Sequence, residues 1–138
     1  METNLNIEQI TPELVWTVRH EVLYPDLGIE AVKLEDDFIG THFGAFTDNK
    51  LAGVVSVYED GDKLLFRKFS VRGEFQNKKI GSQLMEYILN HAKSLEKTAI
   101  WCNARASALY FYKKFGFVPN GKTFTKNGIN FMTIEKEI

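Results

Sequence analysis

Length, composition and charge limit the classes of protein to which this chain can belong. The chain has 138 residues, of which 44% are hydrophobic, including 11 Phe. These values suit one globular domain, residues 1–138, and exclude disorder as the main state. A formal net charge of -1 argues against general nucleic-acid binding.

No segment of the sequence resembles a membrane span or a secretory signal. The longest apolar run, residues 52–57, has six residues, far fewer than the ~18 that a membrane helix needs. Residues 1–10 have neither a basic start nor an apolar stretch. Cys102 is the single cysteine, which fits a reducing compartment. We therefore expect a cytoplasmic protein that does not enter the membrane.

The first half of the chain predicts a strand, a helix and three further strands. A strand at 5–10 precedes a helix at about 12–23, whose start is indicated by Thr11 and Pro12. Residues 26–40 are acidic and weakly patterned, which is typical of a loop with or without a short helix. Strands at 43–46 and 51–58 are joined at Asp48-Asn49, a hairpin signal. The third strand of this group is residues 64–71.

The second half alternates helices and strands before a final hairpin. The apolar spacing predicts a helix that starts at Ile80 and includes Leu95, a buried strand at 98–102, and a helix at about 106–115 that Gly116 ends. Strand resumes from Phe117 onward, and Asn127-Gly128 predicts a hairpin between about 122–126 and 129–134. The expected fold is therefore mixed α/β in the order β-α-β-β-β-α-β-α-β-β, with parallel and antiparallel neighbours.

Charge is distributed unevenly along the chain. Residues 1–62 hold 13 acids and 3 bases, whereas residues 63–138 hold 5 acids and 14 bases. One interpretation is two ordinary solvated surfaces. The other is a bipolar molecule whose C-terminal half binds an anion and whose N-terminal half faces a cation.

One segment carries the features of an anion site. The sequence after strand 64–71 runs through Lys78 and Lys79 into Gly81 and Ser82, where a helix opens. A helix start presents unpaired backbone N–H groups and the positive end of the helix dipole. The alternative is an ordinary helix start with two solvated lysines. Phosphate-loop and dinucleotide fingerprints are absent, and the three histidines lack metal-ligand spacing, so we expect no metal.

Two motifs resemble the signatures of the GNAT superfamily of acetyl-CoA-dependent N-acetyltransferases. Gln76-x-x-Lys79-x-Gly81 is similar to Arg/Gln-x-x-Gly-x-Gly/Ala, and residues 108–117 are similar to Ala-x-x-Phe-Tyr-x-Lys-x-Gly-Phe. Residues 19–23 and 128–129 resemble the small ElaA-like branch. The chain departs from the pattern at Lys79, where the signature has Gly, and at Arg105, where Asn is common.

The resemblance implies where coenzyme A binds. The strands 64–71 and 98–102 would separate, with the pantetheine arm between them. The implied contacts come from the end of the first strand, the loop that follows it and the end of the second strand: Phe69, Ser70, Val71, Gln76, Asn77, Lys78, Lys79, Ile80, Gly81, Ser82, Asn103, Arg105 and Tyr112.

The resemblance also implies a mechanism, in which the amine attacks the thioester directly. The backbone N–H of Val71 would stabilise the thioester oxygen, and Tyr112 would protonate the leaving thiolate. A core tyrosine explains the apolar spacing around Tyr112 equally well. Glu59, Glu21, His42 or water are the options for the base.

The leading hypothesis is an N-acetyltransferase for a primary amine of a small molecule or peptide. Arg19 and His20, together with His42 and Glu59, are its candidate acceptor-binding residues; Arg19 and His20 could equally lie on an exposed helix face. One alternative is a non-catalytic acyl-CoA sensor of the same fold. Another is an interaction protein whose acidic face binds a basic partner. A homodimer is the default assembly.

Overall fold

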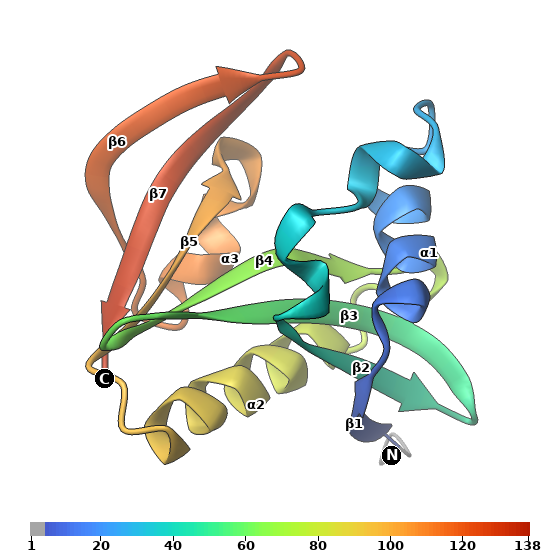
Figure 1. The fold of residues 1–138 in the computed structure, drawn as a ribbon, viewed down its shortest axis with the longest axis horizontal. Coiled ribbons are helices and arrows are strands. Elements are labelled where there is room, and N and C mark those ends of the chain that lie inside the picture. The colour runs from blue at the N-terminus through green and yellow to red at the C-terminus, as the bar shows by residue number, and fades with distance from the viewer. Residues whose placement is uncertain (1–4) are drawn as a thin grey trace. The chain divides into compact units, whose positions relative to one another are not determined.

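The computed structural model describes residues 5–138, which form three α-helices, four 3₁₀ helices and a mixed sheet (Figure 1). The seven strands follow the order β1-β2-β3-β4-β5-β7-β6, which confirms the predicted mixed α/β class. The elements are β1 (Leu5–Ile10), α1 (Pro12–Leu23), η1 (Ile29–Val32), η2 (Glu35–Phe38), β2 (Thr41–Thr47), β3 (Lys50–Asp60), β4 (Lys63–Val71), η3 (Gly73–Phe75), α2 (Ile80–Ser94), β5 (Ala99–Arg105), η4 (Ala106–Ala108), α3 (Leu109–Lys113), β6 (Val118–Lys126) and β7 (Ile129–Glu137).

The chain divides into two compact units. Unit 1 consists of residues 1–58 and 66–90, and unit 2 consists of residues 59–65 and 91–138. The division cuts β3, β4 and α2, so each of these elements supplies residues to both units. Consequently, neither unit is a continuous stretch of sequence.

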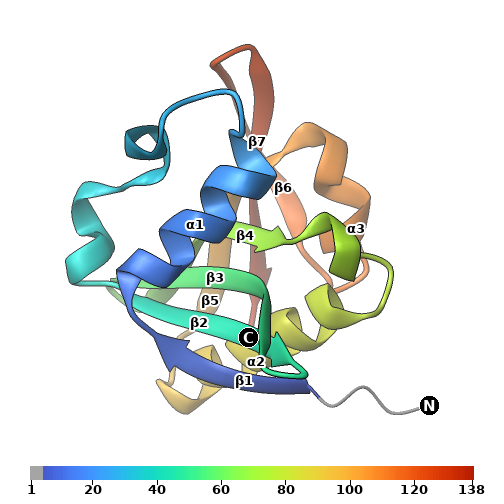
Figure 2. The same ribbon diagram turned by 90° about the vertical axis from the view of Figure 1, so that its right-hand side faces the viewer.

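In unit 1, antiparallel strands form a sheet with one helix on each face. Gly44 pairs with Val54, and Phe43 pairs with Val55, so the two pairs point to opposite faces. Val54 packs in a cluster with Val15 and Val18 of α1. On the other face, the ring of Phe43 lies 5.0 Å from that of Tyr87 on α2. Figures 1 and 2 show α1 and α2 on the two sides of these strands.

The hairpin between β2 and β3 is confirmed. Asp48 and Asn49 have φ values of 51° and 64°. Positive φ at both central residues is the requirement of the tight turn that joins twisted antiparallel strands.

Unit 2 combines parallel and antiparallel pairing, as predicted. Residues 63–65 of β4 run parallel to residues 99–101 of β5. Strand β5 is antiparallel to β7, and β7 is antiparallel to β6. Asn127 and Gly128 have φ values of 53° and 75°, which confirms the second hairpin. Every residue of β6 is exposed.

The helix predicted over about 106–115 starts at Ala106 as expected but is shorter and less regular than predicted. The first turn is the 3₁₀ helix η4, and α3 covers only five residues. The helix closes early because the backbone N–H groups of Phe115 and Phe117 both donate to the carbonyl of Tyr112. Gly116 has a φ of 92°, so its predicted place at the helix end is confirmed.

Three further boundaries differ from the expectation. Residues 26–40 contain two 3₁₀ helices, η1 and η2, where we expected a loop with at most one short helix. Strand β6, at 118–126, confirms the strand predicted from Phe117 onward. Strand β5 continues to Arg105, and β7 continues to Glu137 rather than ending near Ile134. The pairing of β5 with β7 extends both strands, and such pairing leaves no local sequence signal.

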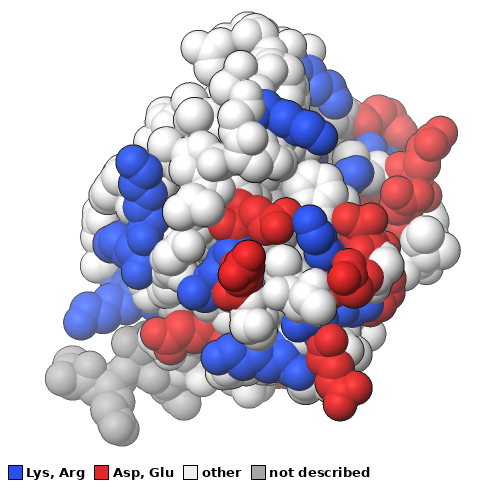
Figure 3. Space-filling view, turned by 90° about the vertical axis from the view of Figure 1, so that its left-hand side faces the viewer, with Lys and Arg blue, Asp and Glu red and all other residues white. Residues whose placement is uncertain are grey.

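The surface carries both signs of charge. The face in Figure 3 presents Lys and Arg as well as Asp and Glu side chains, so neither sign covers it alone. Within residues 5–138, no helix combines the length and apolarity needed to cross a membrane.

Candidate functional site

The end of β4 is interrupted at Lys68. This residue has a φ of 57°, which breaks the alternation of a regular strand. The hydroxyl of Ser70 donates to the Lys68 carbonyl at 3.0 Å, and Ser70 is buried. Phe69 and Val71 are half-buried. The three backbone residues predicted to contact coenzyme A therefore follow directly after the interruption.

Two contacts hold the chain just beyond Val71. The side chain of Gln76 donates from Nε2 to the Val71 carbonyl at 3.0 Å. The backbone N–H of Arg72 donates to the Ala52 carbonyl at 2.8 Å. The Gln76 side chain is thus bonded within unit 1, and its contact with coenzyme A stays a prediction.

The loop before α2 alternates in backbone handedness. Asn77 and Lys79 have φ values of 62° and 64°, whereas the intervening Lys78 has a negative φ. Such alternation turns successive N–H groups toward one point and forms an anion-binding concavity. The signature that this segment resembles has glycine at position 79, which suits a left-handed φ because glycine adopts this conformation without strain. Lys79 adopts this left-handed backbone conformation although its side chain has a Cβ.

Positive charge and the helix start reinforce this concavity. Lys78 and Lys79 are exposed, and within the described part of the chain neither forms an ion pair. Ile80 is buried and anchors the first turn of α2, in which Gly81 and Ser82 follow. These residues fit a pyrophosphate, because unpaired helix N–H groups and two cations favour an anion.

Tyr112 lies in unit 2 among other aromatic rings. Its ring centroid is 5.2 Å from that of Phe111 and 6.0 Å from that of Phe117. Tyr112 is 7% exposed. Burial raises the pKa of its phenol far above the usual value, and Cys102 adds to this rise. The phenol therefore stays protonated at neutral pH and can donate a proton or a hydrogen bond.

The other predicted residues of unit 2 lie along β5. Asn103 is exposed, and its Oδ1 accepts a hydrogen bond from the Thr133 hydroxyl at 2.6 Å. Arg105 is half-buried at the end of the strand. Cys102 is a buried free thiol whose pKa is raised by burial, which suits an inert core residue rather than a nucleophile.

Arg19 is the centre of a buried polar cluster in unit 1. Its guanidinium donates to both carboxylate oxygens of Asp37, at 2.9 and 3.0 Å. It also donates to the Val32 carbonyl at 2.8 Å and the Ser56 hydroxyl at 2.7 Å. Both Arg19 and Asp37 are fully buried. The cluster ties α1 and η2 to β3.

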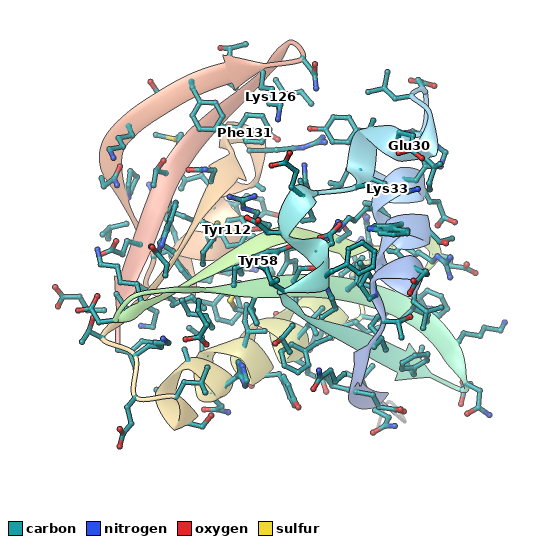
Figure 4. All side chains as sticks on the ribbon, viewed as in Figure 1. Glu30, Lys33, Tyr58, Tyr112, Lys126 and Phe131 are labelled. Atoms are coloured by element: carbon teal, nitrogen blue, oxygen red, sulfur yellow. The ribbon has the colours of Figure 1, made fainter. Side chains whose placement is uncertain are left out.

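Two further side chains donate hydrogen bonds to the carboxylate of Asp37. Tyr58 donates from its hydroxyl at 2.9 Å (Figure 4), and Trp16 donates from its indole at 2.8 Å. Burial alone would raise the pKa of Asp37, but hydrogen bonds from Arg19 and from the Leu34 backbone outweigh it and lower the pKa to about 2. Burial and the bond to Asp37 raise the pKa of Tyr58 to about 12.

Three other acceptor-binding candidates also have partners within their own units. His42 is buried, with Nδ1 2.6 Å from the Ser56 hydroxyl and Nε2 2.6 Å from the Asp37 carbonyl. His20 contacts the Leu27 carbonyl through Nε2. Glu59 pairs with Lys97 in unit 2. Arg19 and His42 thus share one buried cluster, and the acceptor roles of all these residues stay predictions.

The sequence analysis missed Asp37, Ser56 and Tyr58. Asp37 stands in an acidic run with Glu35 and Asp36, and nothing in the pattern separates the buried acid from its exposed neighbours. The signal that could have pointed to it is Arg19, which lies on the apolar side of the predicted helix and needs an acidic partner if buried.

Within residues 5–138, no group of three or more His, Cys, Asp or Glu side chains is arranged to hold a metal ion.

Comparisons with known proteins identify the family and the fold. The profile of the Acetyltransferase (GNAT) domain family matches residues 8–138. The uncharacterized N-acetyltransferase YitI of Bacillus subtilis is 28% identical over 134 residues, covering 91% of this chain and 90% of YitI.

Two solved structures share the fold. Escherichia coli ElaA has a TM-score of 0.80 at 16% identity, covering 96% of this chain and 99% of ElaA. A GNAT family acetyltransferase from Elizabethkingia anophelis with acetyl-CoA bound has a TM-score of 0.77 at 19% identity, covering 99% and 100%. The family match spans nearly the whole chain, and the resemblance seen in the sequence is confirmed: the protein belongs to the GNAT family of acetyltransferases.

Proposed function

We propose that this protein transfers the acetyl group of acetyl-CoA to a primary amine of a small molecule or a peptide. The observation that carries the proposal is the loop 76–82, which matches a family signature and combines left-handed residues, a helix start and two cations. The acetyl-CoA bound in the Elizabethkingia anophelis structure supports this choice of donor.

The chain's own residues supply binding and charge stabilisation. Acetyl-CoA, when bound, would supply a thioester whose carbonyl carbon the amine attacks as the bond to sulfur breaks. The N–H of Val71 donates to the carbonyl oxygen, where negative charge develops. The hydroxyl of Tyr112 gives its proton to the sulfur. The backbone of residues 69–71 and the loop 76–82 hold the coenzyme, and Asn103 and Arg105 add contacts.

We propose water as the acceptor of the amine's proton. The three candidate side chains already have partners: Glu59 pairs with Lys97, Glu21 lies against Arg72, and His42 is enclosed by Ser56 and Asp37. A base must be able to reach the proton that it removes.

The proposal also covers the domain organisation, the cellular location and the assembly of the protein. We propose that both units serve a single acetyltransferase domain, because the family match runs through both. We further propose a cytoplasmic enzyme, where Cys102 stays reduced, and a homodimer, the commonest symmetric assembly.

The test combines turnover with direct binding. Thiol release from acetyl-CoA is measured against a panel of small amines and peptide N-termini, and coenzyme A binding is measured by calorimetry. Gly81→Glu adds a negative charge in the first turn of α2, where a helix tolerates an acid well, so we expect a folded protein that no longer binds coenzyme A. Gly28→Glu is the matched control, since a Cβ at Gly28 meets nothing within 4 Å.

The outcomes separate the alternatives. Binding with amine-dependent thiol release supports the enzyme. Coenzyme A binding without thiol release with any amine favours the acyl-CoA sensor. The departures from the family signature at Lys79 and Arg105 also favour this alternative. Equal affinity of wild type and Gly81→Glu contradicts the placement of the coenzyme, and absence of any binding favours the interaction protein.

A further inference from the structure

Arg72 joins three segments of unit 1 at the end of β4. Its Nε lies 3.2 Å from Oε2 of Glu21 on α1, and its Nη1 donates to the Leu51 carbonyl at 2.9 Å. Its backbone N–H donates to the Ala52 carbonyl at 2.8 Å. The Arg72 side chain is 22% exposed and that of Glu21 is 54% exposed. One residue therefore links α1, the start of β3 and the end of β4.

These bonds immobilise the peptide group that follows Val71. The carbonyl of Val71 accepts from Gln76, and the N–H of Arg72 donates to Ala52. Because a peptide group is planar, holding its two polar atoms fixes its orientation.

The preceding peptide group is confined by packing. A Cβ on Gly53 would lie 3.0 Å from the Ser70 carbonyl oxygen and 3.2 Å from Cγ2 of Val71. Strand β3 therefore approaches the Ser70–Val71 peptide as closely as glycine permits. The N–H of Val71 belongs to this peptide, so its direction depends on how firmly β3 and β4 are held together.

We propose that Glu21 and Arg72 form a positioning pair for acetyl transfer, which holds β4 against β3 and thereby aims the Val71 N–H. The inference rests on the proposed function, in which that N–H stabilises the thioester oxygen. Neither side chain touches the reacting atoms in this role. An error of about 1 Å in such a donor can lower a rate about 10²-fold.

The positioning role differs from the role of Glu21 as a base. Within the described residues, the contact of Glu21 with Arg72 is an ion pair without a hydrogen bond at Nε. Gln at position 21 keeps a side-chain oxygen of similar reach beside Arg72 but cannot take up a proton. Positioning therefore predicts that Glu21→Gln retains most of the turnover that Glu21→Ala loses. A base predicts equal loss in both.

Four variants test the pair: Glu21→Ala, Glu21→Gln, Arg72→Lys and, as matched control, Glu30→Ala. Glu30 forms an ion pair with Lys33 at 2.8 Å, also in unit 1 (Figure 4), and lies outside the proposed site. The turnover number and KM for acetyl-CoA are measured with the amine of highest turnover in the panel. We expect Glu21→Ala to lower turnover between roughly tenfold and 10²-fold, with KM within about twofold of wild type, as losing a donor used mainly in the transition state requires.

Arg72→Lys keeps the cation but loses the planar fork that reaches both Glu21 and Leu51, so its turnover should fall between that of wild type and Glu21→Ala. The melting temperature should change little in all four variants, because partly exposed ion pairs contribute about 0–1 kcal/mol. A turnover of Glu21→Ala equal to that of Glu30→Ala overturns the proposal.

A measurement without substrate separates this inference from the proposed function. The amide resonance of Val71 in the free protein should shift in Glu21→Ala, return toward wild type in Glu21→Gln, and stay in place in Glu30→Ala. If wild type shows no turnover with any amine, the proposed function fails while the resonance still decides the positioning. An unmoved Val71 resonance in Glu21→Ala overturns it.

Discussion

Lys79 adopts a backbone conformation that is unfavourable for lysine. Its φ of 64° lies in the left-handed region, which costs a residue with a Cβ roughly 1–2 kcal/mol. The chain keeps this strain at the position where the family signature has glycine. The proposed function explains why lysine stands in place of glycine, because the ammonium of Lys79 adds a cation beside the coenzyme's phosphates.

Two substitutions at Lys79 separate its charge from its strain. We expect Lys79→Gly and Lys79→Ala to weaken coenzyme A binding alike, about fivefold for a lost contact of roughly 1 kcal/mol. Lys79→Gly relieves the strain and should be up to about 1 kcal/mol more stable than Lys79→Ala. Calorimetry and urea unfolding measure the two effects. Equal stability of both variants would contradict the strained conformation.

Tyr112 distinguishes catalysis from packing. Tyr112→Phe keeps the ring and its aromatic contacts, so the acid role predicts a turnover lowered roughly 10²-fold with little change in acetyl-CoA affinity. Tyr110→Phe is the control, since Tyr110 lies on the same helix and is 73% exposed. A turnover of Tyr112→Phe equal to that of Tyr110→Phe would make Tyr112 a core residue only.

The pH profile gives a second measure of Tyr112. Burial raises the pKa of Tyr112 above its ordinary value of about 10. The phenol is active when protonated, so the loss of its proton should lower the wild-type turnover only at a pH above the ordinary pKa of about 10. We expect no decline from this group up to about pH 10, measured as turnover against pH. A phenol that titrates near 10 or lower contradicts the buried environment.

The segment that contains η1 and η2 depends on one buried ion pair. Asp37 holds Arg19 with two bonds and accepts further bonds from Trp16, Tyr58 and the Leu34 backbone. Removing one partner of a buried pair leaves an uncompensated charge, which costs about 3–5 kcal/mol. We expect Asp37→Ala to lower the free energy of unfolding by this amount in urea. Asp36→Ala, at the exposed neighbour, should change it by less than about 0.5 kcal/mol.

The same pair makes stability depend on acid. The pKa of Asp37 is lowered from 3.8 to about 2, so the folded state binds its proton less readily than the unfolded chain. The stabilisation is therefore complete above about pH 4 and disappears as pH falls through about 2. Unfolding free energies measured across this range should show the loss in wild type and not in Asp37→Asn. If the unfolding free energies of wild type and Asp37→Asn depend on pH in the same way, the lowered pKa of Asp37 is contradicted.

At the scale of the whole molecule, folding mixes the two charged halves of the sequence. Unit 1 contains 12 acids and 8 bases, and unit 2 contains 6 acids and 9 bases. The imbalance within each unit is much smaller than that between residues 1–62 and 63–138. Lys78 and Lys79 belong to unit 1, together with the acidic N-terminal segment.

Coenzyme binding should therefore depend on local cations rather than on a basic half. We expect the affinity for coenzyme A to fall as salt rises, because counter-ions screen exposed charges. Replacing Lys78 and Lys79 together by Ala should flatten that dependence, whereas replacing Lys113 and Lys114, in unit 2, should leave it nearly unchanged. Calorimetry at several salt concentrations measures the slopes. An equal slope in wild type and the Lys78/Lys79 variant would make the pair solvated surface.

Local patterns in the sequence were sufficient for the type and order of the elements. The hairpins at residues 48–49 and 127–128 were predicted from residues that tolerate positive φ, and the structure confirms both. The start of α2 at Ile80 followed from apolar spacing. Each of these features depends on neighbours within a few residues, so the chain encodes it locally.

The predictions fell short where distant segments decide the outcome. The short α3 and the long β7 depend on backbone bonds within unit 2, and the left-handed φ of Lys79 contradicts what a lysine prefers by itself. Helix spacing and strand propensity contain no information about which carbonyl accepts a given N–H.

The sequence by itself determined the family and the mixed α/β order, and it pointed to the segment proposed to bind an anion, because signatures and periodicity are local properties. Only the tertiary structure decided which charged side chains form ion pairs. Arg19 and Asp37 are 18 residues apart, and Glu21 and Arg72 come from α1 and the end of β4. The first pair is fully buried, whereas the second is partly exposed. Both partnerships require the sheet register that places these elements side by side.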